Sequence, residues 1–139
     1  MKNKLFVLFV LLAVVVLSLA ACGGGSPAGD EIVMDEPVPA GAEDAMLVEL
    51  EFTVDEIVPN HVSIPAGQDV LFVIYNSDTE EGDLNEDHNL VAPDIGLQEM
   101  LVVPGQTIRR TWTAYDQPGE YRAGCTIHSW IDMTIEITE

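Results

Sequence analysis

Basic residues are scarce in this sequence. It has 5 Lys and Arg residues against 24 Asp and Glu residues, a formal net charge of −19 at pH 7. Lys2 and Lys4 lie at the start of the chain, so only three basic residues remain after residue 21. Such a surface repels nucleic acid and anionic lipid, and it attracts a cationic protein partner. Solubility in a salty or acidic medium is an equally good reason for the same charge.

Cysteines, helical periodicity and phosphate-binding motifs are rare or missing. Cys22 and Cys125 are the only cysteines. No segment has a convincing helical period, and there is no internal repeat, glycine-rich phosphate loop or nucleophile elbow. These absences argue against a helical domain and against nucleotide chemistry.

The first 21 residues have the composition of a secretory signal peptide. A basic start precedes an apolar run over 5–16, and the segment ends on small residues before Cys22. The run is shorter than the roughly 20 apolar residues of a transmembrane helix, the alternative interpretation. The end of the segment, Leu19-Ala20-Ala21-Cys22, resembles a bacterial lipobox, which implies lipidation of Cys22. We therefore expect an exported protein, lipid-anchored at the extracytoplasmic face of a membrane.

The remaining chain divides by composition into a linker and one domain. Residues 22–45 are rich in Gly, Pro, Ala and acidic residues without periodicity, which predicts a flexible acidic linker. Residues 46–139 form the predicted domain. Lipidation of Cys22 would leave Cys125 as the only free thiol, which excludes an intramolecular disulfide.

The domain has the pattern of an all-β sandwich with about seven to eight strands. Apolar and acidic residues alternate over 46–52, and a β-branched and aromatic run covers 70–75. Pro-Gly turns at 104–105 and 118–119 separate later strands. The charged stretch Ser77 to Asp87 predicts an exposed loop. The other predicted strands lie near 62–64, 88–91, 100–103, 107–113, 121–123 and 134–138.

A thiol, an imidazole and a thioether lie within nine residues near the carboxyl end, at Cys125, His128 and Met133. Two His, one Cys and a weak axial Met form the coordination set of electron-transfer copper sites, whereas zinc usually takes a strong fourth ligand or water. The second His is therefore His88 or His61. His88 begins a strand directly after a loop, where it can meet the Cys125 loop at one end of a sandwich, and His61 is expected to be an exposed turn residue.

From about Met46 to Glu139 the chain resembles the cupredoxins, the plastocyanin and amicyanin family of blue copper proteins. The resemblance rests on motifs that occur in the family's order: Ile64-Pro65-Ala66-Gly67, His88-Asn89, Pro104-Gly105, Pro118-Gly119-Glu120-Tyr121 and Cys125-x-x-His128. It implies a Greek-key β-sandwich that binds one type 1 copper ion through His88, Cys125 and His128. It also implies that Asn89 hydrogen-bonds to the Cys125 loop and that His128 lies near the surface as the port for electrons.

The axial ligand has two candidate positions. Met133 follows His128 at the spacing of plastocyanin-like members and is the favoured ligand. An ungapped match to members with a shorter loop puts Ile131 at that position instead, which leaves three strong ligands. Strand parity does not decide between them, because both residues fall on one face under period-two alternation.

These features predict an electron-transfer protein rather than an enzyme. The sequence has no His-x-His pair for a multicopper cluster and no second mature-chain cysteine for a binuclear centre. The alternative is a copper carrier or chaperone that delivers metal to an exported oxidase. We expect a monomer whose redox protein partners carry a cationic docking patch, with Trp130 forming part of an apolar patch at the copper end.

Overall fold

The computed structural model describes residues 31–79 and 86–139. The predicted signal peptide, Cys22 and most of the predicted linker lie outside this range. Contacts divide the chain at residue 33, so the unit Val33–Glu139 is described by itself. In the described ranges no helix is long and apolar enough to cross a bilayer.

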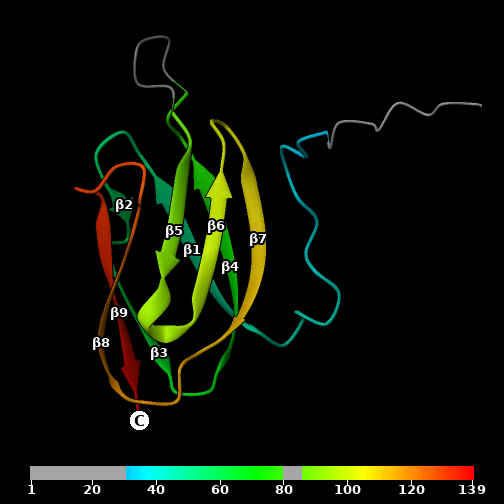
Figure 1. The fold of residues 1–139 in the computed structure, drawn as a ribbon. Coiled ribbons are helices and arrows are strands. Elements are labelled where there is room, and N and C mark those ends of the chain that lie inside the picture. Colours follow the sequence, from blue (N-terminus) through cyan, green and yellow to red (C-terminus); the bar gives the residue numbers. More distant parts are fainter. Residues whose placement is uncertain (1–30, 80–85) are drawn as a thin grey trace, which may run out of the picture. The chain divides into compact units, whose positions relative to one another are not determined.

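The domain consists of two β-sheets that pack face to face (Figure 1). The first sheet has the order β2-β1-β4-β7, and the second has the order β3-β9-β8-β5-β6. Strands β1 and β4 run parallel, as do β3 and β9, whereas β8 and β9 form an antiparallel pair. The first sheet contains β1 (Met46–Phe52), β2 (Ile57–Val58), β4 (Asp69–Asn76) and β7 (Thr107–Thr113). The second sheet contains β3 (His61–Pro65), β5 (His88–Ala92), β6 (Leu97–Val102), β8 (Gly119–Gly124) and β9 (Asp132–Thr138).

The prediction of an all-β sandwich is confirmed, with nine strands in the described residues. The additional strand is β2, whose two residues are too few to produce a periodic pattern. A 3-10 helix, η1 (Pro93–Ile95), joins β5 to β6, and Gly96 ends it with a φ of 70°. Gly suits this left-handed conformation because it has no Cβ.

The core lies between the sheets and follows the alternation of the sequence. In β1 the residues Val48, Leu50 and Phe52 are buried, while the residues between them face solvent. In β9 the buried set is Met133, Ile135 and Ile137. Burying each such side chain stabilises the fold by about 1.5–3 kcal/mol. The core therefore holds both ends of the sandwich in fixed positions.

The described part of the predicted linker contacts the domain. Backbone hydrogen bonds join Met34 and Glu36 to Thr107 at the start of β7, with N···O distances of 2.7 and 3.0 Å. The carboxylate of Glu36 accepts hydrogen bonds from Arg109 and Arg110. The hydrogen bond from Arg110 is the main cause that lowers the pKa of Glu36. Packing thus begins before residue 46, because the segment covers the edge strand β7, a feature that a search for periodicity does not detect.

Candidate metal centre

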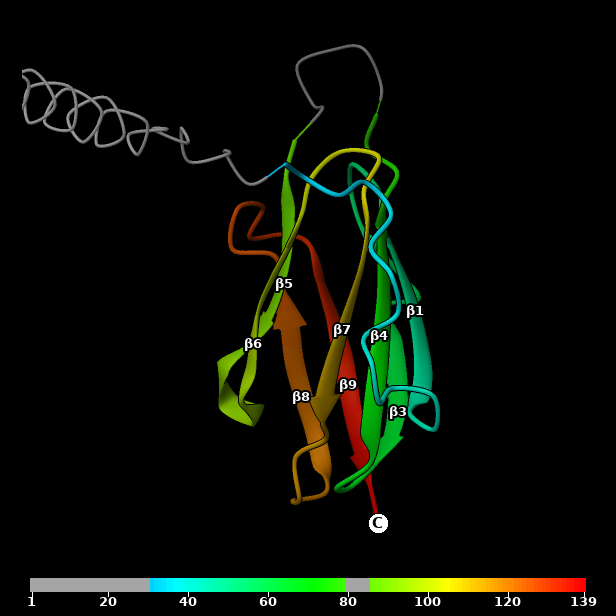
Figure 2. The same ribbon diagram turned by 90° about the vertical axis from the view of Figure 1, so that its right-hand side faces the viewer.

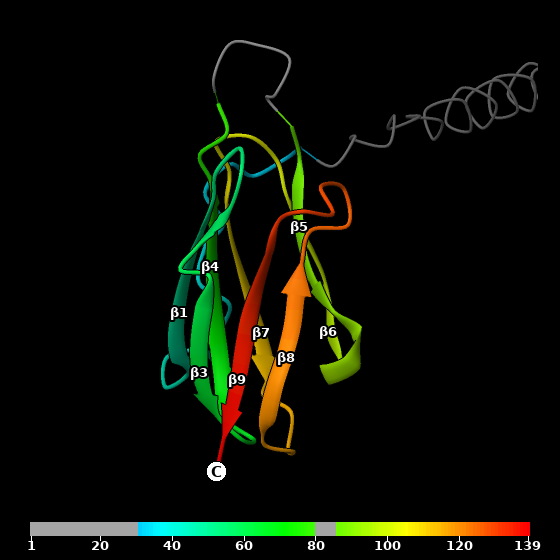
Figure 3. The ribbon, with the colours of Figure 1, turned by 90° about the vertical axis from the view of Figure 1, so that its left-hand side faces the viewer.

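The three predicted strong ligands meet at one end of the sandwich. His88 is the first residue of β5, Cys125 directly follows β8, and His128 lies in the loop between β8 and β9. Strands β5 and β8 are neighbours in the second sheet, and Val91 pairs with Gly124. This pairing brings the start of β5 and the end of β8 to the same end of the domain, at the upper end of Figure 3.

One donor atom from each of these residues lies within 4.8 Å of the other two. The Sγ of Cys125 is 3.9 Å from the Nδ1 of His88 and 3.9 Å from the Nδ1 of His128. A point equidistant from three atoms so spaced is roughly 2.5 Å or less from each, which suits metal–sulfur and metal–imidazole bonds. All three residues are buried, with exposed fractions of 0% to 8%. One thiolate and two imidazoles in a buried triangle fit copper.

The sulfur of Cys125 lies near two backbone N–H groups. The amides of Asn89 and His128 donate to it, with N···S distances of 3.5 and 3.4 Å. Such donors stabilise negative charge on the sulfur and, in copper–thiolate sites, influence the reduction potential. The geometry thus suits a metal-bound sulfur.

Asn89 joins the two ligand segments. Its Oδ1 accepts a hydrogen bond from the backbone N–H of Thr126 at 2.7 Å, and its Nδ2 donates to the Thr126 Oγ1 at 2.7 Å. Asn89 is 1% exposed, whereas Thr126 is exposed, so these bonds are partly buried. The start of β5 is therefore held to the loop that carries Cys125 and His128.

His88 is enclosed by apolar and aromatic groups. Its ring stacks on Phe52 with centroids 5.0 Å apart and planes 8° apart. Burial lowers the pKa of His88, and the nearby ring of His128 lowers it further, while Asp78 acts in the opposite direction. A lowered pKa keeps the imidazole neutral near pH 7, and the neutral form binds a metal.

His128 is largely enclosed by neighbouring side chains. Only 8% of the residue is exposed. The Trp130 ring lies edge-on to it at 5.1 Å, and a Glu86 carboxylate oxygen is 2.5 Å from its Nε2. His128 also borders a surface groove, so its role as the port for electrons stays a prediction. Trp130 itself is 65% exposed at this end.

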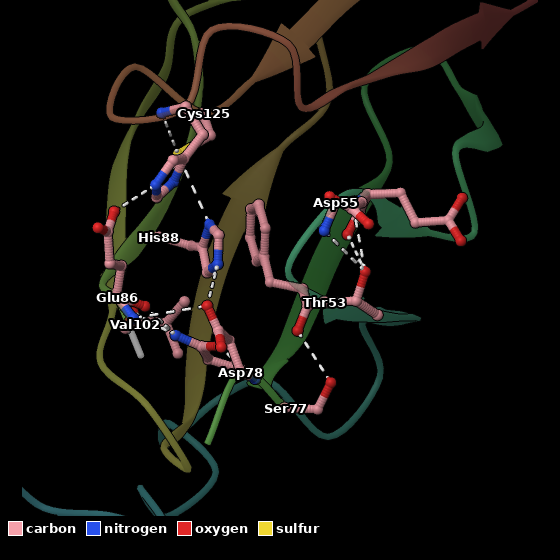
Figure 4. Close-up of polar contacts among 12 residues, drawn as sticks. Thr53, Asp55, Ser77, Asp78, Glu86, His88, Val102 and Cys125 are labelled. Atoms are coloured by element: carbon pink, nitrogen blue, oxygen red, sulfur yellow. Dashed lines mark hydrogen bonds and ion pairs between the residues drawn. The ribbon is translucent and has the colours of Figure 1, made fainter. Parts of the chain in front are cut away.

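The predicted exposure of the whole stretch 77–87 is wrong at Asp78, which is only 2% exposed. Its Oδ2 is 3.6 Å from the Nε2 of His88 (Figure 4). Asn76 stabilises this position, since its Oδ1 accepts the Asp78 backbone N–H at 2.9 Å. The high charge of the segment predicted exposure, and the contact between Asp78 and His88 could not be predicted because contacts between distant residues leave no local pattern in the sequence.

The register of β8 and β9 separates the two axial candidates. Gly124 pairs with Asp132 and Ala123 with Met133, while the Cys125 N–H donates to the Ile131 carbonyl at 3.0 Å. Ile131 therefore lies directly across from Cys125, and Met133 lies two residue pairs further along the strand. Both side chains are buried. Met133 as the axial ligand stays a prediction, and the register favours Ile131 as the neighbour of the site.

Gly124 permits this close approach. A Cβ at this position would lie 2.9 Å from the carbonyl oxygen of Ile131 and 3.2 Å from the Cβ of Asp132. Real Cβ atoms do not approach backbone that closely, so a side chain here would displace the ligand loop. The glycine before Cys125 could have indicated in the sequence that two backbone segments come close together at this point.

His61 lies outside the cluster. It starts β3, its side chain is 50% exposed, and its Nε2 is 3.3 Å from a carboxylate oxygen of Glu136. The predicted exposure of His61 is confirmed, but its predicted position in a turn is wrong, because the residue begins a strand that pairs with β9.

Comparisons with known proteins relate the chain to copper proteins. The family model for the cupredoxin-like domain matches residues 8–137. None of the curated proteins compared with the chain matches it in sequence.

Three solved structures share the fold at low identity. Auracyanin A, a blue copper protein from Chloroflexus aurantiacus, is 15% identical with a TM-score of 0.52, over 68% of this chain and 99% of that one. A chain of a heme-copper terminal oxidase dimer is 18% identical with a TM-score of 0.52, over 99% and 97%. The metal-binding domain of the Streptococcus pneumoniae Cu(I)-exporting ATPase CopA, solved with Cu(I), is 7% identical with a TM-score of 0.56, over 78% and 97%.

These structural similarities show only a shared fold. The family match, in contrast, covers nearly the whole chain. Together with the buried His-Cys-His cluster at one end of a two-sheet sandwich, the match shows that this chain belongs to the cupredoxin-like family.

Proposed function

We propose that the protein carries single electrons between redox partners by means of one type 1 copper ion. The observation that supports this most directly is the convergence of His88, Cys125 and His128, whose donor atoms lie within 4.8 Å of one another. A copper ion bound there would supply a one-electron change between its two oxidation states.

The protein's own contribution is to hold these ligands still, since electron transfer is fast when ligands barely move. Two ligands lie in one short loop, and the third begins a strand of the same sheet. Asn89 ties these segments together, and the buried cluster excludes water. Such support restricts ligand movement during a change of charge.

Copper loading of the full chain tests the proposal. We expect one Cu(II) per chain, an intense visible band from thiolate-to-copper charge transfer, and reversible one-electron reduction. Visible spectroscopy during copper titration and cyclic voltammetry measure these properties. A colourless protein that binds Cu(I) and exchanges it readily would contradict the proposal.

That contrary outcome would support the second candidate, a copper carrier or chaperone that delivers metal to an exported oxidase. The likeness to the Cu(I)-bound domain of CopA favours it. The burial of all three donor residues favours electron transfer instead, because a carrier must release its metal to a partner. The described donors would hold a single metal ion, and we infer that the protein is not an enzyme.

We propose that redox partners dock beside His128. A groove of about 340 Å³ there is lined by the apolar residues Ile127 and Trp130 and by the acidic residues Asp55, Asp78 and Glu86. Of these acidic residues Asp55 and Glu86 are exposed, and their charges beside apolar side chains suit a partner with a cationic patch.

Ionic strength tests this docking surface with small redox reagents. Added salt should slow oxidation by cationic cobalt(III) tris(phenanthroline) and accelerate oxidation by anionic ferricyanide, because salt screens exposed charges over about 10 Å at 0.1 M. Stopped-flow kinetics at several salt concentrations measure both rates. Equal salt dependence for the two reagents would contradict an acidic docking surface.

We also propose export, cleavage before Cys22 and lipid anchoring there, with the domain acting as a monomer outside the cytoplasm. The apolar run and the Leu19-Ala20-Ala21-Cys22 motif support this. Mass spectrometry of the membrane-extracted protein should find a lipidated residue 22 as the N terminus, and sedimentation of the copper-loaded protein should give one chain per particle.

A further inference from the structure

Both histidines of the cluster have the same arrangement of neighbours. Each ring directs Nδ1 toward the sulfur of Cys125, at 3.9 Å in both cases. Each ring places Nε2 beside a carboxylate: Asp78 Oδ2 lies 3.6 Å from His88, and Glu86 Oε2 lies 2.5 Å from His128. Figure 4 shows Asp78 and Glu86 beside the cluster.

The chemistry of a neutral imidazole explains why a carboxylate beside each Nε2 atom would be useful. When Nδ1 binds a metal, Nε2 carries the remaining proton and needs an acceptor. In the described residues, two buried side-chain atoms have no hydrogen-bond partner: the Nε2 of His88 and the Oδ1 of Asp78. A carboxylate 2% exposed is costly unless a positive group faces it. A metal-bound imidazole with its N–H directed at Asp78 would meet that need.

Asn76 holds the two carboxylate-bearing segments in position. It is fully buried, and its Oδ1 accepts the backbone N–H of Asp78 at 2.9 Å. Its Nδ2 donates to the backbone carbonyls of Glu86 and Val102, at 3.0 and 3.3 Å. Val102 pairs with His88 across β5 and β6. One side chain thus joins both acidic segments to the sheet that carries the cluster.

From these contacts we propose that Asp78 and Glu86 are positioning residues that accept hydrogen bonds from the Nε2–H groups of metal-bound His88 and His128 and lower the reduction potential of the site. The proposal rests on the proposed copper function. The two negatively charged carboxylates beside the Nε2 atoms stabilise the more positive oxidised state, and their hydrogen bonds orient both rings. Asp78 has the larger effect, because its buried charge is screened less than that of Glu86, whose side chain is 45% exposed.

Charge-neutral variants of the full, copper-loaded chain test the proposal. Asp78→Asn and Glu86→Gln keep the shape and remove one charge, and Glu49→Gln, on the exposed face of β1, is the matched control. We expect Asp78→Asn to shift the redox equilibrium toward the reduced form at least tenfold, which is about 59 mV for one electron. Glu86→Gln should shift it about threefold in the same direction, and Glu49→Gln less than twofold.

A second readout reports proton position. In the diamagnetic Cu(I) form of the parent protein, nitrogen NMR should show Nε2–H protons on both rings that exchange slowly with water. Asp78→Asn should accelerate that exchange at His88, and Asp78→Glu should restore slow exchange. If Asp78→Asn fails to fold, the potential and exchange of Glu86→Gln test the proposal, because Glu86 is partly exposed and its replacement is less disruptive to the fold.

The inference and the proposed function fail in different ways. A parent protein without the thiolate band overturns the proposed function. A parent with that band, together with variants whose potential and exchange match those of Glu49→Gln, overturns the inference alone. An N–H on Nδ1 instead of Nε2 of either histidine would also overturn it.

Discussion

Replacing Cys125 with Ser is expected to abolish the visible band completely while leaving the sandwich folded. The hydroxyl has the shape of the thiol but cannot supply the soft sulfur on which the band depends, and it suits copper less well. Visible spectroscopy after copper loading measures the loss. Affinity for Cu(I), measured by competition with a chelator, should fall by several orders of magnitude.

The control for this variant is the other cysteine. Cys22→Ser should keep the full band, because the converging donor atoms belong to residues 88, 125 and 128. Cys125 is 4% exposed, so a hydroxyl there costs about 1–3 kcal/mol of folding free energy unless it finds a partner. Urea unfolding of the metal-free variant separates that cost from the lost band. Retention of the band by Cys125→Ser would contradict the assigned ligand set.

Introducing a thioether at position 131 is expected to change the site more than removing the one at position 133. Ile131 lies across from Cys125, where cross-strand Cβ atoms are about 4.5–5.5 Å apart. Ile131→Met therefore brings sulfur close to the metal and should lower the potential by about 59 mV or more, a tenfold change in the redox equilibrium. Cyclic voltammetry and the ratio of visible bands measure the effect.

The companion variant Met133→Leu should change the potential little. Met133 pairs with Ala123, two residue pairs away from Cys125, and a Met-to-Leu exchange in a core usually costs less than about 1.5 kcal/mol. A marked rise in potential for Met133→Leu would show that its thioether reaches the metal, as the loop spacing predicts. The pair of variants thus decides between the two registers.

The sequence predicted those parts of the molecule that local patterns specify. Alternation in β1 and the branched run in β4 identified strands, because a strand with one buried face must alternate. The Cys-x-x-His spacing and the strand position of His88 predicted the three residues that the structure brings together. Residues in loops at the same end of neighbouring strands must lie close together, so few other arrangements of these three side chains are possible.

The features that the sequence did not predict depend on contacts between distant segments. The burial of Asp78 depends on a fold that places it beside His88, and its acidic neighbours in the chain indicate exposure. The contact of Glu36 with Arg109 and Arg110 spans more than 70 residues. The choice between Ile131 and Met133 as the axial neighbour depends on the register between β8 and β9. Side-chain alternation along the strand does not give that register, because both residues fall on one face.

Strand β9 ends at the pole of the sandwich opposite the start of β5 and the end of β8, where the candidate metal ligands lie, as Figures 1 and 2 show for these strands. Thr138 pairs with Pro65 there, and β8 runs from that pole to the ligand loop, a length of roughly 20 Å at 3.3 Å per residue. A thiol or affinity tag added after Glu139 would therefore fix the molecule to a gold electrode with the candidate metal centre facing the solution. Direct tunnelling from the metal would be slow in that orientation, while dissolved mediators would have free access.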